Sequence, residues 1–157
     1  DTVLKECAEM TKGLVVSDFT GLTEENACTI GQKLYLRYHI SGVRGQMEAG
    51  LPAVRKVGLP VLKNGLARGL SLNDSGCAAL LALMTSATDT NLIARSDLPT
   101  QQKTVAKIKE LLAESPYPDH QTLEQLDREF MEKNLSPGGS ADLLAICYLL
   151  YFLENEV

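Results

Sequence analysis

The sequence predicts an all-α fold, and two observations lead to that prediction. Apolar residues recur at intervals of three and four along most of the 157 residues, which is the period of an amphipathic helix. Strand-like alternation of apolar and polar residues is absent except in the short run 14–19, which is ambiguous. Because no repeat or linker interrupts the pattern, residues 1–157 are expected to form a single multi-helix domain. We expect this domain to be the C-terminal part of a larger helical fold.

The expected helices follow one another along the chain. The first is expected from Thr23 to Tyr38, because an N-cap threonine followed directly by two glutamates is typical of a capped helix N-terminus. The next segment, from Met47 to Leu66, contains two glycines and two prolines near its middle, which predicts two short helices or one kinked helix. Further helices are expected at 73–84, with Asp74 in its first turn, and at 88–95, 101–113, 122–133 and 140–153.

Composition and charge exclude several classes of protein. A hydrophobic content of 45% with 22% charged residues is enough to build a buried core. The net charge of -5 provides no broad basic surface, so we expect no nucleic-acid partner. The longest apolar stretch, 143–153, is far shorter than the roughly 20 residues that cross a bilayer, so no membrane is expected.

The cysteines and the start of the chain indicate a cellular location. Cys7, Cys28, Cys77 and Cys147 lie far apart without a CxxC pair, which argues against a zinc site and against a small disulfide framework. A reducing cytoplasm fits this pattern best. No signal peptide is visible, and the chain opens at Asp1, so we expect the numbering to begin inside a longer product.

Two glycines and two serines directly precede the last expected helix, in the run Ser-Pro-Gly-Gly-Ser at 136–140. With Ser140 as N-cap and Asp142 in the first turn, Gly138 and Gly139 let the backbone approach a ligand while N–H groups face an anion such as phosphate. The alternative is an ordinary helix start, in which the glycines relieve strain and Asp142 satisfies the helix dipole.

A second candidate stretch is Thr88 to Arg95. Helical spacing places Thr88, Asn91 and Arg95 on one side of the expected helix. Asp89 lies beside that side in the first turn. It either caps the helix or holds a divalent cation through its oxygens.

A third candidate stretch places Arg44 between two glycines, with Glu48 four residues later. One interpretation is an ordinary ion pair between residues i and i+4 of a helix. The other is an arginine that clamps a phosphate beside a metal-binding carboxylate.

The three stretches together resemble the motifs of the triphosphoribosyl-dephospho-CoA synthase family. The resemblance rests on Gly42-Val-Arg-Gly45 with Glu48, on Asp89-Thr-Asn91 with Arg95, and on Asn134-Leu-Ser-Pro-Gly-Gly-Ser-Ala-Asp-Leu-Leu144, in this order. It covers the chain from about Gly42 to Phe152.

This resemblance implies a transferase with an all-α fold. In such an enzyme the 2'-hydroxyl of 3'-dephospho-CoA attacks the ribose C1' of ATP, adenine leaves, and the triphosphate stays on the transferred sugar. The product, 2'-(5''-triphosphoribosyl)-3'-dephospho-CoA, is the prosthetic-group precursor for the acyl carrier protein of citrate lyase or malonate decarboxylase.

The resemblance also implies roles for individual residues. Three phosphates require Mg²⁺, arginines and amide N–H groups, and the attacking hydroxyl requires a base. Developing positive charge on the ribose favours a nearby carboxylate. Phosphate or nucleotide binding is expected of Arg44, Asn91, Arg95, Ser136, Gly138, Gly139 and Ser140. The catalytic and Mg²⁺-binding candidates are Asp89, Asp142 and Glu48, and Glu48 is either a metal ligand or the general base.

The chain departs from the family pattern in three places. Gln46 replaces a glutamate, Ser96-Asp97 replaces a glycine pair, and the family's upstream Pro-Gly-Leu-Val-Asp-like and His-x-Asp-Met-like segments are absent. We therefore expect that part of the active site is missing and that this fragment alone is inactive. The missing N-terminal half or a second copy is expected to cover its apolar surface.

Two other functions remain as alternatives. One is a catalytically silent all-α interaction module, and the other is a Mg²⁺-dependent nucleotide phosphohydrolase. His39 and His120 have no histidine three or four residues away, so we expect both to be ordinary surface or half-buried histidines.

Overall fold

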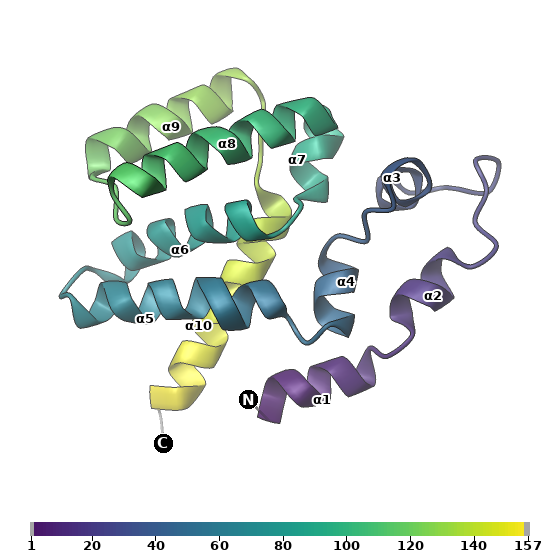
Figure 1. Cartoon of the computed structure of the whole chain (residues 1–157), viewed down its shortest axis with the longest axis horizontal. Helices are drawn as coiled ribbons and strands as arrows, with labels where there is room; N and C mark the ends of the chain where they lie inside the picture. The colour runs from purple at the N-terminus through teal and green to yellow at the C-terminus, as the bar shows by residue number, and fades with distance from the viewer. Residues whose placement is uncertain (1, 156–157) are drawn as a thin grey trace. The chain divides into compact units, whose positions relative to one another are not determined.

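The computed structural model describes residues 2–155 and confirms the all-α class, since every regular element in that range is a helix (Figure 1). The elements are α1 (Thr2–Met10), α2 (Leu14–Phe19), α3 (Ile30–Tyr38), α4 (Val43–Glu48), the π-helical turn η1 (Val54–Gly58), α5 (Leu59–Ala67), α6 (Leu72–Ser86), α7 (Thr90–Arg95), α8 (Leu98–Glu114), α9 (His120–Glu132) and α10 (Gly138–Asn155). Within the described range, no helix has both the length and the apolar composition of a membrane span.

The contacts divide the chain into two compact units, Asp1–Pro52 and Ala53–Val157. The first contains α1 to α4, and the second contains η1 and α5 to α10. The expected single domain over 1–157 stays a prediction, because a division by contacts does not measure folding cooperativity.

In the first unit, the helix expected from Thr23 begins only at Ile30. Its N-cap is Thr29, which forms a capping box with Gln32. Upstream, the side chains of Thr23 and Asn26 each accept a hydrogen bond from the other's backbone N–H. The predicted start was wrong because such local bonds offer the backbone an alternative to the helix. The ambiguous run 14–19 is helix α2.

The break expected between 47 and 66 is confirmed. Helix α4 ends before Gly50 and Leu51, which both have positive φ, of 73° and 55°. The chain then winds as η1 and passes directly into α5. Pro60 has no N–H to donate to the carbonyl four residues earlier, so a regular α-helical turn cannot close there, and the wider π turn is found instead.

Helix α6 lies at the centre of the second unit, in contact with η1, α5, α8 and α10. Its small residues, including Gly76, Ala78 and Ala79, are buried and let these neighbours approach closely. On η1, a Cβ added to Gly58 would lie 2.6 Å from Cys147 Sγ and 2.8 Å from Leu83 Cδ2. The glycine therefore permits the close packing of η1 against α6 and α10.

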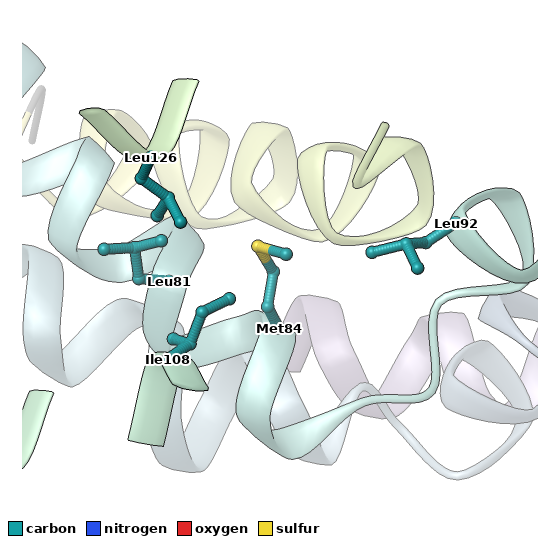
Figure 2. Close-up of a cluster of buried hydrophobic side chains, with 5 residues drawn as sticks. All are labelled: Leu81, Met84, Leu92, Ile108 and Leu126. Atoms are coloured by element: carbon teal, nitrogen blue, oxygen red, sulfur yellow. The ribbon is translucent and has the colours of Figure 1, made fainter. Parts of the chain in front are cut away.

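A cluster of buried side chains joins four helices of the second unit (Figure 2). Its members are Leu81 and Met84 of α6, Leu92 of α7, Ile108 of α8 and Leu126 of α9. The members are 0% to 7% exposed, so they supply much of the hydrophobic stabilisation of this unit. The cluster also fixes α7 and α9 relative to α6, which positions the site described below.

The last helix starts earlier than the sequence predicted. Ser140 was expected as the N-cap, but α10 begins at Gly138 and Ser140 is its third residue. Asp142 therefore lies beyond the first turn. The error arose because the carboxylate that caps this helix comes from a distant part of the chain.

Candidate functional site

Helix α7 packs against the start of α10, so two of the three stretches selected from the sequence lie together. Arg95 Nη1 donates a hydrogen bond to Asn134 Oδ1 at 3.2 Å. Asn91 lies so close to Gly138 that a Cβ on this glycine would be 2.0 Å from Asn91 Nδ2. Only a glycine fits there without displacing the amide. We call these contacts, between residues 89–95 and 134–140, the α7/α10 junction.

Asp89 lies at the centre of the α7/α10 junction and is 3% exposed. Its Oδ1 accepts from the amides of Asn91, Leu92 and Gly139, at 3.0, 3.1 and 3.3 Å. Its Oδ2 accepts from the amide and the hydroxyl of Ser140, at 2.7 and 2.8 Å. One carboxylate thus caps the N-termini of two helices, where the helix dipoles favour a negative charge.

The capping by Asp89 changes which amides of the glycine-rich run 136–140 are available to a ligand. The amides of Gly139 and Ser140, expected to face a phosphate, donate to Asp89 instead. Ser136 and Gly138 are half-buried, and Asp142 is exposed on α10. The capping alternative for Asp89 is therefore the one observed, and phosphate binding by this run stays a prediction.

Arg44 and Glu48 belong to the first unit, where both have other partners. Glu48 accepts from the amide of Gly13 at 2.9 Å and from that of Val15 at 3.0 Å, which caps the start of α2. Arg44 Nε pairs with Asp18 Oδ2 at 2.6 Å. The expected i,i+4 pair of Arg44 with Glu48 is therefore replaced by two separate interactions.

Two of the three expected Mg²⁺ ligands, Asp89 and Glu48, can be tested for fit from these contacts. Both carboxylate oxygens of Asp89 and of Glu48 already accept backbone N–H groups. Across residues 2–155, no group of three or more His, Cys, Asp or Glu side chains could hold a metal ion. In this arrangement Asp89 and Glu48 do not fit a metal site, because their lone pairs are directed at amides.

The second unit also contains a cavity of about 550 Å³ between α6 and α9. We call it the α6/α9 groove. Sixteen residues line it: Asn73, Asp74, Cys77, Leu80, Leu81 and Met84 of α6, His120, Leu123, Glu124, Leu126, Asp127, Phe130 and Met131 of α9, and Leu135, Ser136 and Pro137 before α10. Ser136 and Pro137 link the groove to the α7/α10 junction.

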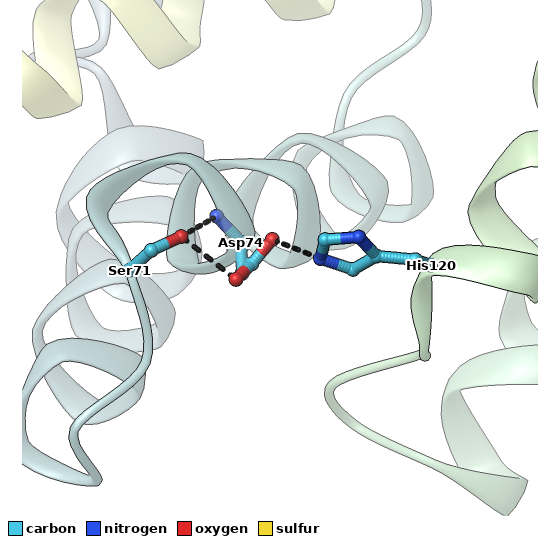
Figure 3. A network of polar contacts seen from close by, with 3 residues as sticks. All are labelled: Ser71, Asp74 and His120. Carbon is cyan, nitrogen blue, oxygen red and sulfur yellow. Dashed lines mark hydrogen bonds and ion pairs between the residues drawn. The ribbon is translucent and has the colours of Figure 1, made fainter.

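A short polar network links the starts of α6 and α9, where Asp74 and His120 line one end of the groove (Figure 3). Asp74 accepts a hydrogen bond from Ser71 Oγ at 2.7 Å, and its other oxygen lies 2.8 Å from His120 Nε2. The bond from Ser71 and the contact with His120 lower the pKa of Asp74. Burial, with a smaller contribution from Asp74, raises the pKa of the nearby Cys77 thiol. No sequence pattern predicts this partner of His120, because Asp74 is 46 residues away.

Comparison with known families gives a match over the whole chain. The family model described as ATP:dephospho-CoA triphosphoribosyl transferase matches residues 1–157. No solved structure gives a significant match.

Individual relatives carry the corresponding name. The chain is 38% identical over 154 residues to a Malonomonas rubra protein named "Probable 2-(5''-triphosphoribosyl)-3'-dephosphocoenzyme-A synthase", covering 95% of this chain and 49% of the relative. It is 37% identical over 134 residues to the 2-(5''-triphosphoribosyl)-3'-dephosphocoenzyme-A synthase of Pectobacterium atrosepticum, covering 85% and 44%. The chain thus spans about half the length of the relatives it matches.

Proposed function

We propose that this chain, which belongs to the ATP:dephospho-CoA triphosphoribosyl transferase family, contributes to the synthesis of 2'-(5''-triphosphoribosyl)-3'-dephospho-CoA. In this reaction the 2'-hydroxyl oxygen of 3'-dephospho-CoA bonds to the ribose C1' of ATP, and the bond from C1' to adenine breaks. A base takes the hydroxyl proton, and adenine leaves with a proton. The triphosphate remains on the transferred ribose.

The observation that carries this proposal is the α7/α10 junction. Arg95 and Asn91 contact Asn134 and Gly138, although these residues are far apart in the sequence. The junction places a guanidinium and an amide beside the glycine-rich start of α10. Planar guanidinium groups and amide donors suit the oxygens of a phosphate chain.

The contacts that each side chain makes indicate the role we propose for it. We propose that Arg95, Asn91, Ser136 and Gly138 contact the nucleotide directly. Asp89 acts indirectly, because its carboxylate holds α7 against α10. Asp142 is exposed on this unit and remains a catalytic and Mg²⁺-binding candidate, and Glu48 remains either a metal ligand or the general base.

The remaining expectations extend this proposal. Arg44 and Glu48, from the first unit, are proposed to add a phosphate countercharge and a second carboxylate. Mg²⁺ remains expected for a reaction of ATP, but we derive no step through it, because Asp89 and Glu48 do not fit as its ligands. We also propose a cytoplasmic location and delivery of the product to citrate lyase or malonate decarboxylase. An upstream half or a second copy is proposed to cover the apolar surface of this chain.

The test follows the products of the full-length protein with ATP, Mg²⁺ and 3'-dephospho-CoA by chromatography. The proposal expects free adenine and a dephospho-CoA adduct in equal amounts. Phosphate release with retained adenine would support a phosphohydrolase instead, and no turnover would support a silent module.

A matched pair of arginine variants sharpens this test. Arg95→Ala removes the guanidinium of the junction and is expected to lower the rate of adenine release at least about tenfold, since one charged phosphate contact is lost. Arg128→Ala removes the same charge from an exposed position on α9 and should leave the rate unchanged. Equal rates in the two variants would reject the role of Arg95.

A further inference from the structure

We propose that the α6/α9 groove binds the uncharged pantetheine arm of dephospho-CoA, with the nucleotide end of the molecule emerging at Ser136 and Pro137. This inference rests on the proposed function, because dephospho-CoA enters as its acceptor substrate. It goes further by assigning one part of that substrate to a cavity outside the recognised motifs.

The shape of the groove suits an extended ligand. Its lining on α6 extends from Asn73 to Met84 and its lining on α9 from His120 to Met131. Each stretch rises over eleven residues, so the groove is about 16 Å long at 1.5 Å per residue. The volume of about 550 Å³ lies within the usual size of small-molecule sites. A purine base alone would leave most of this length empty.

The floor of the groove belongs to the buried core, and its wall carries more exposed apolar side chains. Leu81, Met84 and Leu126 belong to the buried cluster and also line the groove. Phe130 is half-buried beside them, and Met131 is 65% exposed. Packing of a ligand's methylene and methyl groups against Phe130 and Met131 removes apolar surface from water, which favours binding.

Charge excludes the phosphorylated parts of both substrates from the groove. Asp74, Glu124 and Asp127 contribute carboxylates, and none of the described lining residues is Lys or Arg. A diphosphate or triphosphate would be repelled there. The pantetheine arm carries no charge, and its amide N–H groups can donate to carboxylates. It is therefore the long segment of the two substrates that this lining can accept.

The lining residues between α9 and α10 supply the continuity that the assignment requires. Ser136 and Pro137 line the groove and directly precede Gly138, the first residue of α10. An arm lying in the groove would leave it beside the α7/α10 junction, where Arg95 and Asn91 lie. The diphosphate of dephospho-CoA would then meet cationic and amide donors as soon as it leaves the acidic groove.

The test compares dephospho-CoA with ADP, which has the same adenosine and diphosphate but no arm. Isothermal titration of the full chain is expected to give an affinity for dephospho-CoA at least about tenfold above that for ADP. In a methyl-labelled sample, the resonances of Met84 and Met131 should move with dephospho-CoA and not with ADP. Met10, exposed in the first unit, should stay unchanged with both.

Two substitutions of exposed apolar residues provide the matched controls. Met131→Glu adds a carboxylate to the groove wall and is expected to reduce the advantage of dephospho-CoA over ADP several-fold. Leu149→Glu makes a similar change on α10 outside the groove, where the side chain is 54% exposed, and should preserve the advantage. Both sites are exposed, so neither substitution is expected to prevent folding.

Each contrary result overturns the inference. An affinity for dephospho-CoA no higher than for ADP, including no binding of either, rules out the groove as an arm site. A wild-type dimer that Met131→Glu dissociates would assign the groove to a second copy. Adenine release by the full-length protein, measured in parallel, separates the two proposals: release with unmoved groove resonances rejects only the groove, and moved resonances without release reject only the transfer reaction.

Discussion

In two regions of the second unit an aspartate joins the starts of two helices. The two regions differ in the solvent exposure of that aspartate. At the α7/α10 junction, Asp89 is 3% exposed and accepts five hydrogen bonds from two helix N-termini. At the end of the α6/α9 groove, Asp74, whose side chain is 27% exposed, joins Ser71 of the α6 start to His120, whose side chain is 77% exposed.

The difference shows that the same residue type serves two purposes according to burial. A buried carboxylate with every oxygen engaged is a fixed structural element, since breaking its bonds leaves buried N–H groups unsatisfied. A half-buried carboxylate and an exposed histidine can exchange their contact for water at little cost. The junction is therefore expected to be rigid and the groove end adaptable, as suits a ligand that enters the groove.

The largest expected effect is that of Asp89→Ala. It removes the acceptor of five hydrogen bonds at a buried position, so we expect a loss of about 3 to 5 kcal/mol in the free energy of unfolding. Chemical denaturation measures this loss, and Asp74→Ala is the matched control, with a much smaller effect. A loss below about 1 kcal/mol for Asp89→Ala would refute the structural role of this carboxylate.

A second pair of variants compares two fully buried serines. Ser140 Oγ donates to Asp89, whereas Ser75 Oγ is the one buried side-chain oxygen or nitrogen among the described residues that lacks a hydrogen-bond partner. We expect Ser140→Ala to cost about 1 to 2 kcal/mol of stability. Ser75→Ala should be neutral or stabilising by up to about 1 kcal/mol, because an unsatisfied hydroxyl is removed. Thermal unfolding checks both, and the reverse order would contradict the assigned contacts.

A third prediction concerns the contact of Gly138 with Asn91. Alanine at 138 gains helix propensity but displaces the amide of Asn91, so the net change in stability should be below about 1 kcal/mol. In an Asn91→Ala background only the Cβ of residue 91 remains in close contact, at 3.2 Å, and Gly138→Ala should then stabilise by up to about 1 kcal/mol. Additive effects in this double-mutant cycle would show that the two residues do not contact each other.

The smallest expected effect is the pH dependence of the Asp74 contact. Because the pKa of Asp74 is lowered in the folded chain, its stabilisation is present above the unfolded pKa of 3.8 and is lost as the pH falls through the lower folded pKa. The melting temperature of Asp74→Asn should therefore lie slightly below that of the wild type at neutral pH. The two curves should converge below pH 3.8, and a difference that grows in acid would contradict this sign.

Much of the fold could be predicted from the sequence. The helices of the second unit were placed within a few residues of their observed bounds, because apolar spacing, caps and breakers are local signals. The first unit was harder: the bonds between Thr23 and Asn26 shortened one helix, and the run 14–19 is too short for its period to be diagnostic.

The candidate site was predicted in part. The sequence selected Asp89, Asn91, Arg95 and the 134–140 run as one constellation, and the contacts of α7 with α10 bring them together. It did not reveal that Asp89 would occupy the amides of Gly139 and Ser140, or that Glu48 would cap α2. Nor did it select Asp74 and His120, whose pairing leaves no pattern within either helix.

The sequence by itself determined the helical class, the approximate helix bounds and the family, since these depend on residues close together in the chain. Only the tertiary structure decided which groups satisfy the helix ends, because Asp89 meets Ser140 across 51 residues. Packing of α6, α7 and α9 around one apolar cluster brings such distant residues within hydrogen-bonding distance and opens the groove beside them.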